Sequence, residues 1–159
     1  MTMAWFTGLS EALKGAFSKA GSFLTDHFNE FNNGDFKKAA MAHAAQMTMA
    51  DGSKDAEEVK KVAGIIEKHE LLSQFNAAEL RKMYTDFTND FDFDFDFASE
   101  NIVNTLKKVT EPNQQRGIIM IGIIIGKADG NFDDDEKQVT MNLINLYGHK
   151  ASDYEQYGL

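Results

Sequence analysis

Cysteine is absent from this sequence, and proline occurs only once. Without cysteine the chain can form neither disulfide bonds nor thiolate metal sites, which fits a reducing compartment. The scarcity of proline removes a strong helix breaker. Alanine, lysine, glutamate and methionine are ample, and β-branched residues rarely form runs apart from the isoleucines. This composition predicts an all-α protein.

Basic residues are also in short supply. The 16 lysines and arginines stand against 25 aspartates and glutamates, which gives a net charge of −9, and no stretch is rich in basic side chains. Because binding to a phosphate backbone needs a basic face, nucleic acid is not an expected partner. No apolar run is long enough to cross a bilayer and the N-terminus lacks the pattern of a secretory signal, so we expect a cytoplasmic protein.

The length of 159 residues, 43% of them hydrophobic, suits a single globular domain with its own core. The most apolar stretch, residues 118–125, consists of isoleucine and methionine with one glycine. No face of this segment can point at water without cost, so it predicts a buried central helix, with Pro112 in its first turn. Three further helices are predicted from their caps: Asp35 begins one that runs to about Ala50, Asn76 begins one that runs through Phe87, and Ser99 begins another.

Residues 90–97 alternate strictly between aspartate and phenylalanine. This is the period of an extended segment with one apolar and one acidic face. We expect a connector whose phenylalanines enter the core and whose aspartates are solvated. The alternative is that these aspartates form a third acidic patch that supplements a cation site.

The N-terminal segment, residues 1–31, carries apolar side chains mostly at spacings of three, four or seven, the pattern of an amphipathic helix. These side chains are Trp5, Leu9, Leu13, Phe17, Leu24, Phe28 and Phe31. Two interpretations remain open. The helix covers the domain core, or it lies on a membrane surface with Trp5 and Phe6 as interfacial anchors.

A short acidic motif occurs twice. Residues 50–58, ADGSKDAEE, align without gaps on residues 128–136, ADGNFDDDE, and each copy has a helical pattern before it and an amphipathic helix after it. We infer two related helix–loop–helix halves, whose acidic loops a pseudo-twofold axis could bring together. The whole chain is then a bundle of about seven helices.

Helix capping explains part of each motif. Gly52 and Gly130 suit the left-handed position after a helix end, and Asp55 with Glu58, like Asp133 with Glu136, has the spacing of a capping box. Capping does not explain Asp51 and Asp129, because the dipole at a helix C-terminus disfavours an anion. It also leaves three further carboxylates unexplained, those of Glu57, Asp134 and Asp135.

A hard divalent cation would account for these remaining carboxylates. Carboxylates and free helix-end carbonyls supply the oxygen ligands that Ca²⁺ accepts, and Mg²⁺ or Mn²⁺ are the alternatives. The spacing is not that of an EF-hand, because the glycine follows the first aspartate directly. The four histidines are scattered, so zinc is not expected. From the residues alone, metal binding and pure capping both stay open.

Three segments together resemble the tellurite resistance protein TerB family: residues 127–137 (KADGNFDDDEK), residues 50–52 and residues 91–94. The resemblance implies an all-helical TerB fold over residues 35–150, built from two pseudo-symmetric halves, after the separate segment 1–31. It also implies a non-enzymatic role in bacterial tellurium resistance and stress response. The family's acidic positions carry over to Asp51, Asp55, Glu58, Asp129, Asp133 and Glu136.

We therefore expect a cation-binding adaptor or sensor that works with other tellurite-resistance proteins, such as the integral membrane protein TerC, and that lies peripherally at the inner face of the membrane. Supplementary metal ligands would be Glu57, Asp134 and Asp135. The alternative is an acidic helical scaffold without a metal. An enzyme is not expected, because the sequence shows no phosphate loop, nucleotide fingerprint or Ser/His/Asp constellation.

Overall fold

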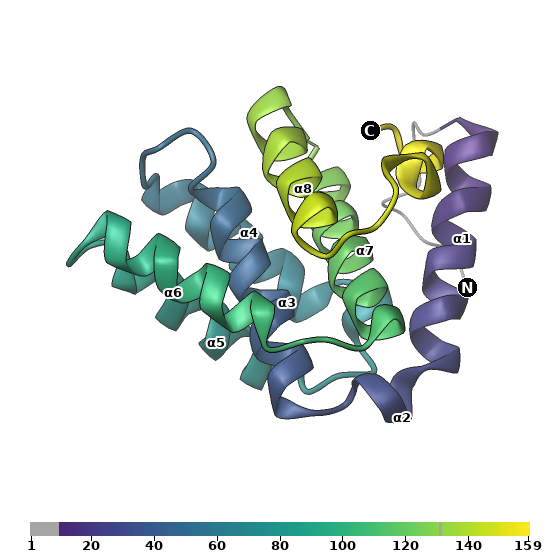
Figure 1. Cartoon of the computed structure of the whole chain (residues 1–159), viewed down its shortest axis with the longest axis horizontal. Coiled ribbons are helices and arrows are strands. Elements are labelled where there is room, and N and C mark those ends of the chain that lie inside the picture. The colour runs from purple at the N-terminus through teal and green to yellow at the C-terminus, as the bar shows by residue number, and fades with distance from the viewer. Residues whose placement is uncertain (1–9, 131) are drawn as a thin grey trace.

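The computed structural model describes residues 10–130 and 132–159, and within them it contains helices and no strand (Figure 1). Their bounds are α1 Glu11–Asp26, α2 Phe28–Phe31, α3 Gly34–Thr48, α4 Ala56–Lys68, α5 Ala77–Asp90, α6 Phe95–Lys107, α7 Pro112–Ala128 and α8 Asp134–Leu146, with two 3₁₀ segments, η2 Glu70–Leu72 and η3 Ala151–Tyr157. Seven of the α-helices have 13 residues or more. The predicted all-α fold is confirmed.

Two helices form the centre of the molecule. Helix α7 is buried over residues 117–126, which confirms the prediction of a buried central helix, and Pro112 occupies its first turn. Helix α3 packs against α5, α6, α7 and α8, and its many buried alanines let these neighbours approach closely. At the contact between α3 and α7, the fully buried His43 ring lies against Gly122, where a Cβ atom would collide with it.

Two helix starts differ from the predictions. The N-cap of α3 is Asn33, whose Oδ1 accepts a hydrogen bond from Phe36 N at 2.9 Å, and Asp35 lies in the first turn. The N-cap of α6 is Asp94 instead of Ser99. Asparagine, aspartate and serine have similar capping preferences, so the choice among neighbouring candidates depends on where the incoming chain becomes extended. The predicted Asn76 cap of α5 is confirmed.

The expectation that the Phe–Asp segment is extended and buries its phenylalanines is wrong, whereas the expected solvent exposure of its aspartates is confirmed. The chain turns at residues 91–94 and becomes helical at Phe95 instead of staying extended. Phe91 is buried, but Phe93 and Phe97 are 89% and 69% exposed. Successive helical residues are about 100° apart, so side chains two positions apart lie on nearly opposite sides of α6 and cannot share one buried face.

Both ends of the described chain pack on the same core. Helix α1 lies at one edge of the bundle beside α7 and η3 (Figure 1), and it buries Phe17 and Leu24. Segment η3 buries Tyr154 and Tyr157, and the Tyr157 ring meets Phe17 edge-on at 5.5 Å between centroids. Trp5 and Phe6, the proposed membrane anchors, lie outside the described residues. No helix in the described ranges combines the length and apolar content needed to cross a membrane.

Candidate metal centre

The two acidic motifs form similar loops, one between α3 and α4 and the other between α7 and α8. Gly52 has a φ of +85° and Gly130 a φ of +77°, so both take the left-handed conformation that the sequence predicts. Each loop ends on an aspartate that caps the following helix, Asp55 for α4 and Asp133 for α8. The two copies of the motif therefore share a left-handed glycine and a capping aspartate.

The two caps differ in one respect that matters for the site. Asp133 Oδ1 accepts a hydrogen bond from Glu136 N at 2.9 Å, and Glu136 Oε1 accepts one from Asp133 N at 3.5 Å, which confirms the capping box of α8. Asp55 Oδ1 accepts from the N–H groups of Glu57 and Glu58, but the Glu58 side chain does not return a bond. The predicted box of α4 is only half formed, and this leaves the Glu58 carboxylate available elsewhere.

Three carboxylates converge where the loops meet. One carboxylate oxygen from each of Glu58, Asp129 and Glu136 lies within 4.8 Å of the others. Glu58 comes from α4, Asp129 from the C-terminal end of α7, and Glu136 from the first turn of α8. Asp129 and Glu136 are only 7% and 6% exposed. The fold therefore places three acidic groups together, two of them buried and Glu58 partly buried.

One lysine approaches this group. The Lys61 ammonium lies 3.1 Å from Asp129 Oδ1 and donates a hydrogen bond of 2.9 Å to the main-chain oxygen of Asp129. Asp129 Oδ1 is buried and accepts no hydrogen bond within the described part of the chain, so its partner is the charge of Lys61 alone. One cation thus faces three carboxylates.

Burial and neighbouring charges raise the pKa values of two of these acids, Glu136 and Glu58. Burial, followed by the charges of Asp133, Asp129 and Glu58, raises the pKa of Glu136 to about 8, against the opposing hydrogen bond from Asp133 N. Burial also raises the pKa of Glu58, followed by the charges of Asp129, Asp51, Asp55 and Asp133. The group therefore favours a bound proton or another positive charge.

The other predicted ligands lie around this centre. Asp51 is exposed, and its Oδ1 accepts hydrogen bonds from the N–H and hydroxyl groups of Ser53. Asp55 and Asp133 are exposed caps. Glu57 lines an open recess together with Asp55, Glu58, Lys61 and Asp129. Asp134 and Asp135 are exposed in the first turn of α8 and lie outside the convergent group.

The Phe–Asp segment lies beside the first loop but does not join the carboxylate group. Lys54, in that loop, pairs with Asp92 at 2.7 Å. The two sequence features are thus neighbours in space, and Asp92 is already matched by a cation.

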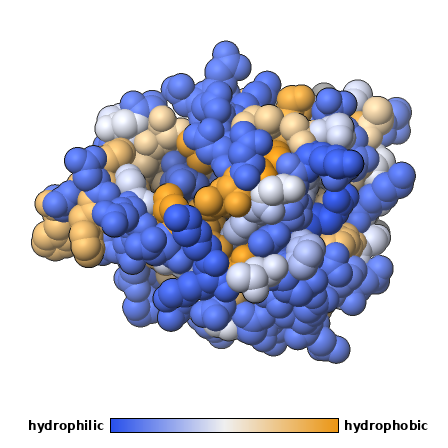
Figure 2. Space-filling view, viewed as in Figure 1, coloured by the Kyte–Doolittle hydropathy of each residue, from blue (hydrophilic) through white to orange (hydrophobic). Residues whose placement is uncertain are grey.

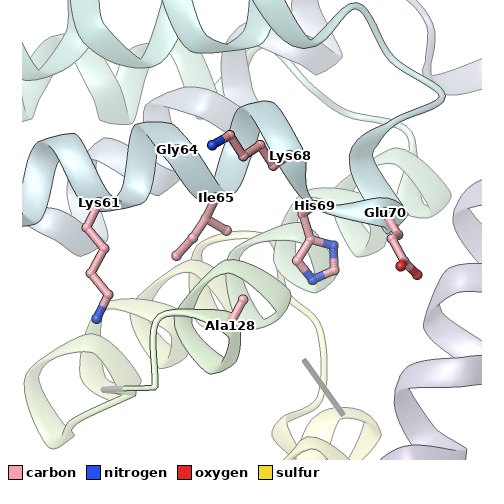
Figure 3. A pocket seen from close by; sticks show the side chains of 7 residues that line it. All are labelled: Lys61, Gly64, Ile65, Lys68, His69, Glu70 and Ala128. Carbon is pink, nitrogen blue, oxygen red and sulfur yellow. The ribbon is translucent and has the colours of Figure 1, made fainter. Parts of the chain in front are cut away.

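Sequence reasoning missed Lys61. Its position, three residues after Glu58 on α4, is the one available signal, because residues at this spacing share a helix face. Lys61 also borders a second recess between α4 and the end of α7, shown in Figure 3, where Lys61, Ile65 and His69 point toward α7 and Lys68 points away. Burial lowers the pKa of His69 to about 4, so this imidazole is uncharged at neutral pH.

Comparison with known proteins gives one finding. The family model described as "Tellurite resistance protein TerB" matches residues 37–159. A search of curated proteins and a search of solved structures each gave no match.

Proposed function

This chain belongs to the TerB family of tellurite-resistance proteins, and from that premise we propose that it is a non-enzymatic adaptor or sensor that binds a divalent cation between its two acidic loops. The observation that supports cation binding most directly is the convergence of Glu58, Asp129 and Glu136. The proposed adaptor role, with other tellurite-resistance proteins such as TerC as partners at the inner face of the membrane, is supported by the family membership alone.

The residues present fit a hard cation. The convergent group consists of carboxylates alone, and the main-chain oxygen of Asp129 is a further oxygen donor beside it. All-oxygen sites suit Ca²⁺, Mg²⁺ and Mn²⁺, whereas zinc prefers histidine and cysteine ligands. We place Ca²⁺ first because it accepts irregular coordination, while Mg²⁺ demands near-octahedral geometry.

The buried oxygen of Asp129 gives the proposal its physical basis. A carboxylate oxygen that is removed from water and accepts no hydrogen bond is costly unless a positive charge compensates it. Lys61 supplies part of that charge from an exposed side chain, so a divalent ion could take its place without disturbing the core. The bound ion would also satisfy Glu58 and Glu136.

An acidic scaffold without a metal is the second candidate, and two observations favour it. Asp55 and Asp133 cap helices, and Lys61 already pairs with Asp129. In this scheme Lys61 together with a proton on Glu136 would balance the carboxylates. The two candidates differ in what added calcium does to the protein.

Calorimetric titration of chelator-stripped protein with Ca²⁺, Mg²⁺ and Mn²⁺ tests the proposal. We expect Ca²⁺ to bind and to stabilise the fold, since a ligand at 100 times its dissociation constant adds about 2.7 kcal/mol. Asp129→Asn should abolish the binding. Asp134→Asn is the matched control, because it removes the same charge from an exposed position outside the group. Equal binding by the two variants, or no binding by the unmodified protein, would favour the scaffold.

A further inference from the structure

Three phenylalanines project from the end of the molecule where α6 begins. We call Phe93, Phe95 and Phe97 the phenylalanine tip; their exposed fractions are 89%, 38% and 69%. Figure 2 shows a hydrophobic cluster among hydrophilic atoms at the end of the molecule that holds the start of α6 in Figure 1. Among the described residues, the one other large hydrophobic side chain that is exposed is Leu146.

The rings of Phe93 and Phe97 take no part in packing the core. Helix α6 is anchored by Ala98, Ile102 and Leu106, which recur every four residues along its buried side. Phe91 enters the core, and its ring meets Phe95 at 4.8 Å between centroids. Phe93 and Phe97 lie beyond this contact in solvent. Exposed aromatic side chains gathered at one place are typical of a surface that another molecule covers.

The chain segment that bears the tip carries charge of one sign. Residues 83–106 contain no lysine or arginine. They contain six acids, which are Asp86, Asp90, Asp92, Asp94, Asp96 and Glu100. Asp86 pairs with Lys82 and Asp92 with Lys54, and the other four have no ion pair within the described residues. Phenylalanine rings and unpaired carboxylates therefore alternate over a short distance.

We propose that the phenylalanine tip is a docking surface for a polypeptide segment that presents lysine or arginine beside apolar side chains. Such cations are attracted both to the carboxylates and to the faces of the aromatic rings, while the apolar side chains of the segment cover the ring edges. The inference rests on the adaptor part of the proposed function, because an adaptor needs a surface for its partner. It does not require a bound metal.

Charge disfavours the other occupants. A second copy of this chain would bring the same acids against each other, and the anionic surface of a cytoplasmic leaflet would be repelled in the same way. A cationic segment meets neither of these repulsions. The electrostatic attraction also predicts that docking weakens as salt is added.

Binding of a synthetic peptide tests the inference. The probe is a fluorescently labelled amphipathic helical peptide of leucine and lysine, and its anisotropy is followed as the full-length protein is added. We expect saturable binding that the double variant Phe93→Ser/Phe97→Ser weakens by about tenfold or more, because each exposed ring is lost from the contact. Leu146→Ser is the matched control, since it removes another exposed apolar side chain away from the tip. It should bind as the unmodified protein does.

Several results would overturn the docking surface. One is that the unmodified protein fails to bind the peptide, and another is that the double variant binds it as tightly as the unmodified protein does. A third is that a scrambled peptide that lacks an apolar face binds as tightly as the amphipathic one. Flotation with phosphatidylcholine–phosphatidylglycerol vesicles that depends on Phe93 and Phe97 would assign the tip to membranes instead. Self-association that depends on them, measured by sedimentation, would assign it to a second copy.

The peptide titration is repeated in the presence of chelator and in the presence of Ca²⁺. Melting curves check that each variant folds. If the unmodified protein binds calcium but does not bind the peptide, the docking proposal is contradicted and the cation proposal is not. Peptide binding by a protein that shows no calorimetric binding of Ca²⁺ supports the tip and contradicts the cation proposal alone.

Discussion

Lys61 and Asp129 are 68 residues apart in the chain, yet the Lys61 ammonium lies 3.1 Å from Asp129 Oδ1 and donates a 2.9 Å hydrogen bond to the Asp129 main-chain oxygen. The pair joins helix α4, which follows the first acidic loop, to the end of α7, which begins the second. It also places an ammonium group beside the carboxylates that we propose as metal ligands. Lys61 is thus the natural competitor of a divalent cation.

Removing this competitor should strengthen calcium binding. We expect Lys61→Met to lower the dissociation constant for Ca²⁺ roughly two- to fivefold, in line with the strength of an exposed ion pair. Calorimetric titration measures the change. The control is Lys60→Met, at an exposed neighbour without an ion pair in the described structure. Weaker binding by Lys61→Met would mean that the lysine organises the site instead of occupying it.

Loss of the proton from Glu136 should make the metal-free protein less stable as pH rises. Its pKa is about 8 in the folded protein against an ordinary 4.5, so folding favours the protonated form. That contribution is fully present below about pH 4.5 and is lost as pH rises through about 8. Glu136→Gln should therefore flatten the fall of melting temperature across this window, measured in chelator. An unchanged slope would show that Glu136 is not the group responsible.

Variants of Asp133 can distinguish a role in helix capping from a role in metal binding. Asp133→Asn keeps the side-chain oxygen that accepts from Glu136 N, so we expect stability to change by only a few tenths of a kcal/mol. Asp133→Ala removes the acceptor and should cost about 1 kcal/mol in urea unfolding. Since Asp133 lies outside the convergent group, calcium binding should survive in the asparagine variant. Its complete loss there would place Asp133 among the ligands.

The contact between α3 and α7 should not tolerate a larger residue at Gly122. A Cβ atom at this position collides with the buried His43 ring, and we expect Gly122→Ala to destabilise the fold by about 1–3 kcal/mol. Gly15 in α1 has nothing near its own Cβ position, so Gly15→Ala should stabilise by about 0.5–1 kcal/mol. Denaturant unfolding of both variants checks the pair. Equal effects would contradict the close packing of the two central helices.

Local patterns in the sequence were enough to predict the features that depend on neighbouring residues. The isoleucine run predicts a helix without a solvent face, and α7 is buried as expected. The glycine after each first aspartate predicts a left-handed turn, and Gly52 and Gly130 have it. The spacing of Asp133 and Glu136 predicts the capping box, which forms. Each of these follows from periodicity or backbone geometry within a few residues.

Which of the acids lie together depends on how the helices pack. The two motifs match in sequence, yet Glu58, Asp129 and Glu136 converge while Asp51, Asp55 and Asp133 stay at the periphery. Lys61 lies beside Asp129 although it stands outside both acidic motifs. Phe97 is exposed to solvent because α6 begins at Phe95. The relative placement of α4, α7 and α8 is set by the packing of their buried faces. Packing of this kind depends on residues far apart in the chain, and no local pattern records it.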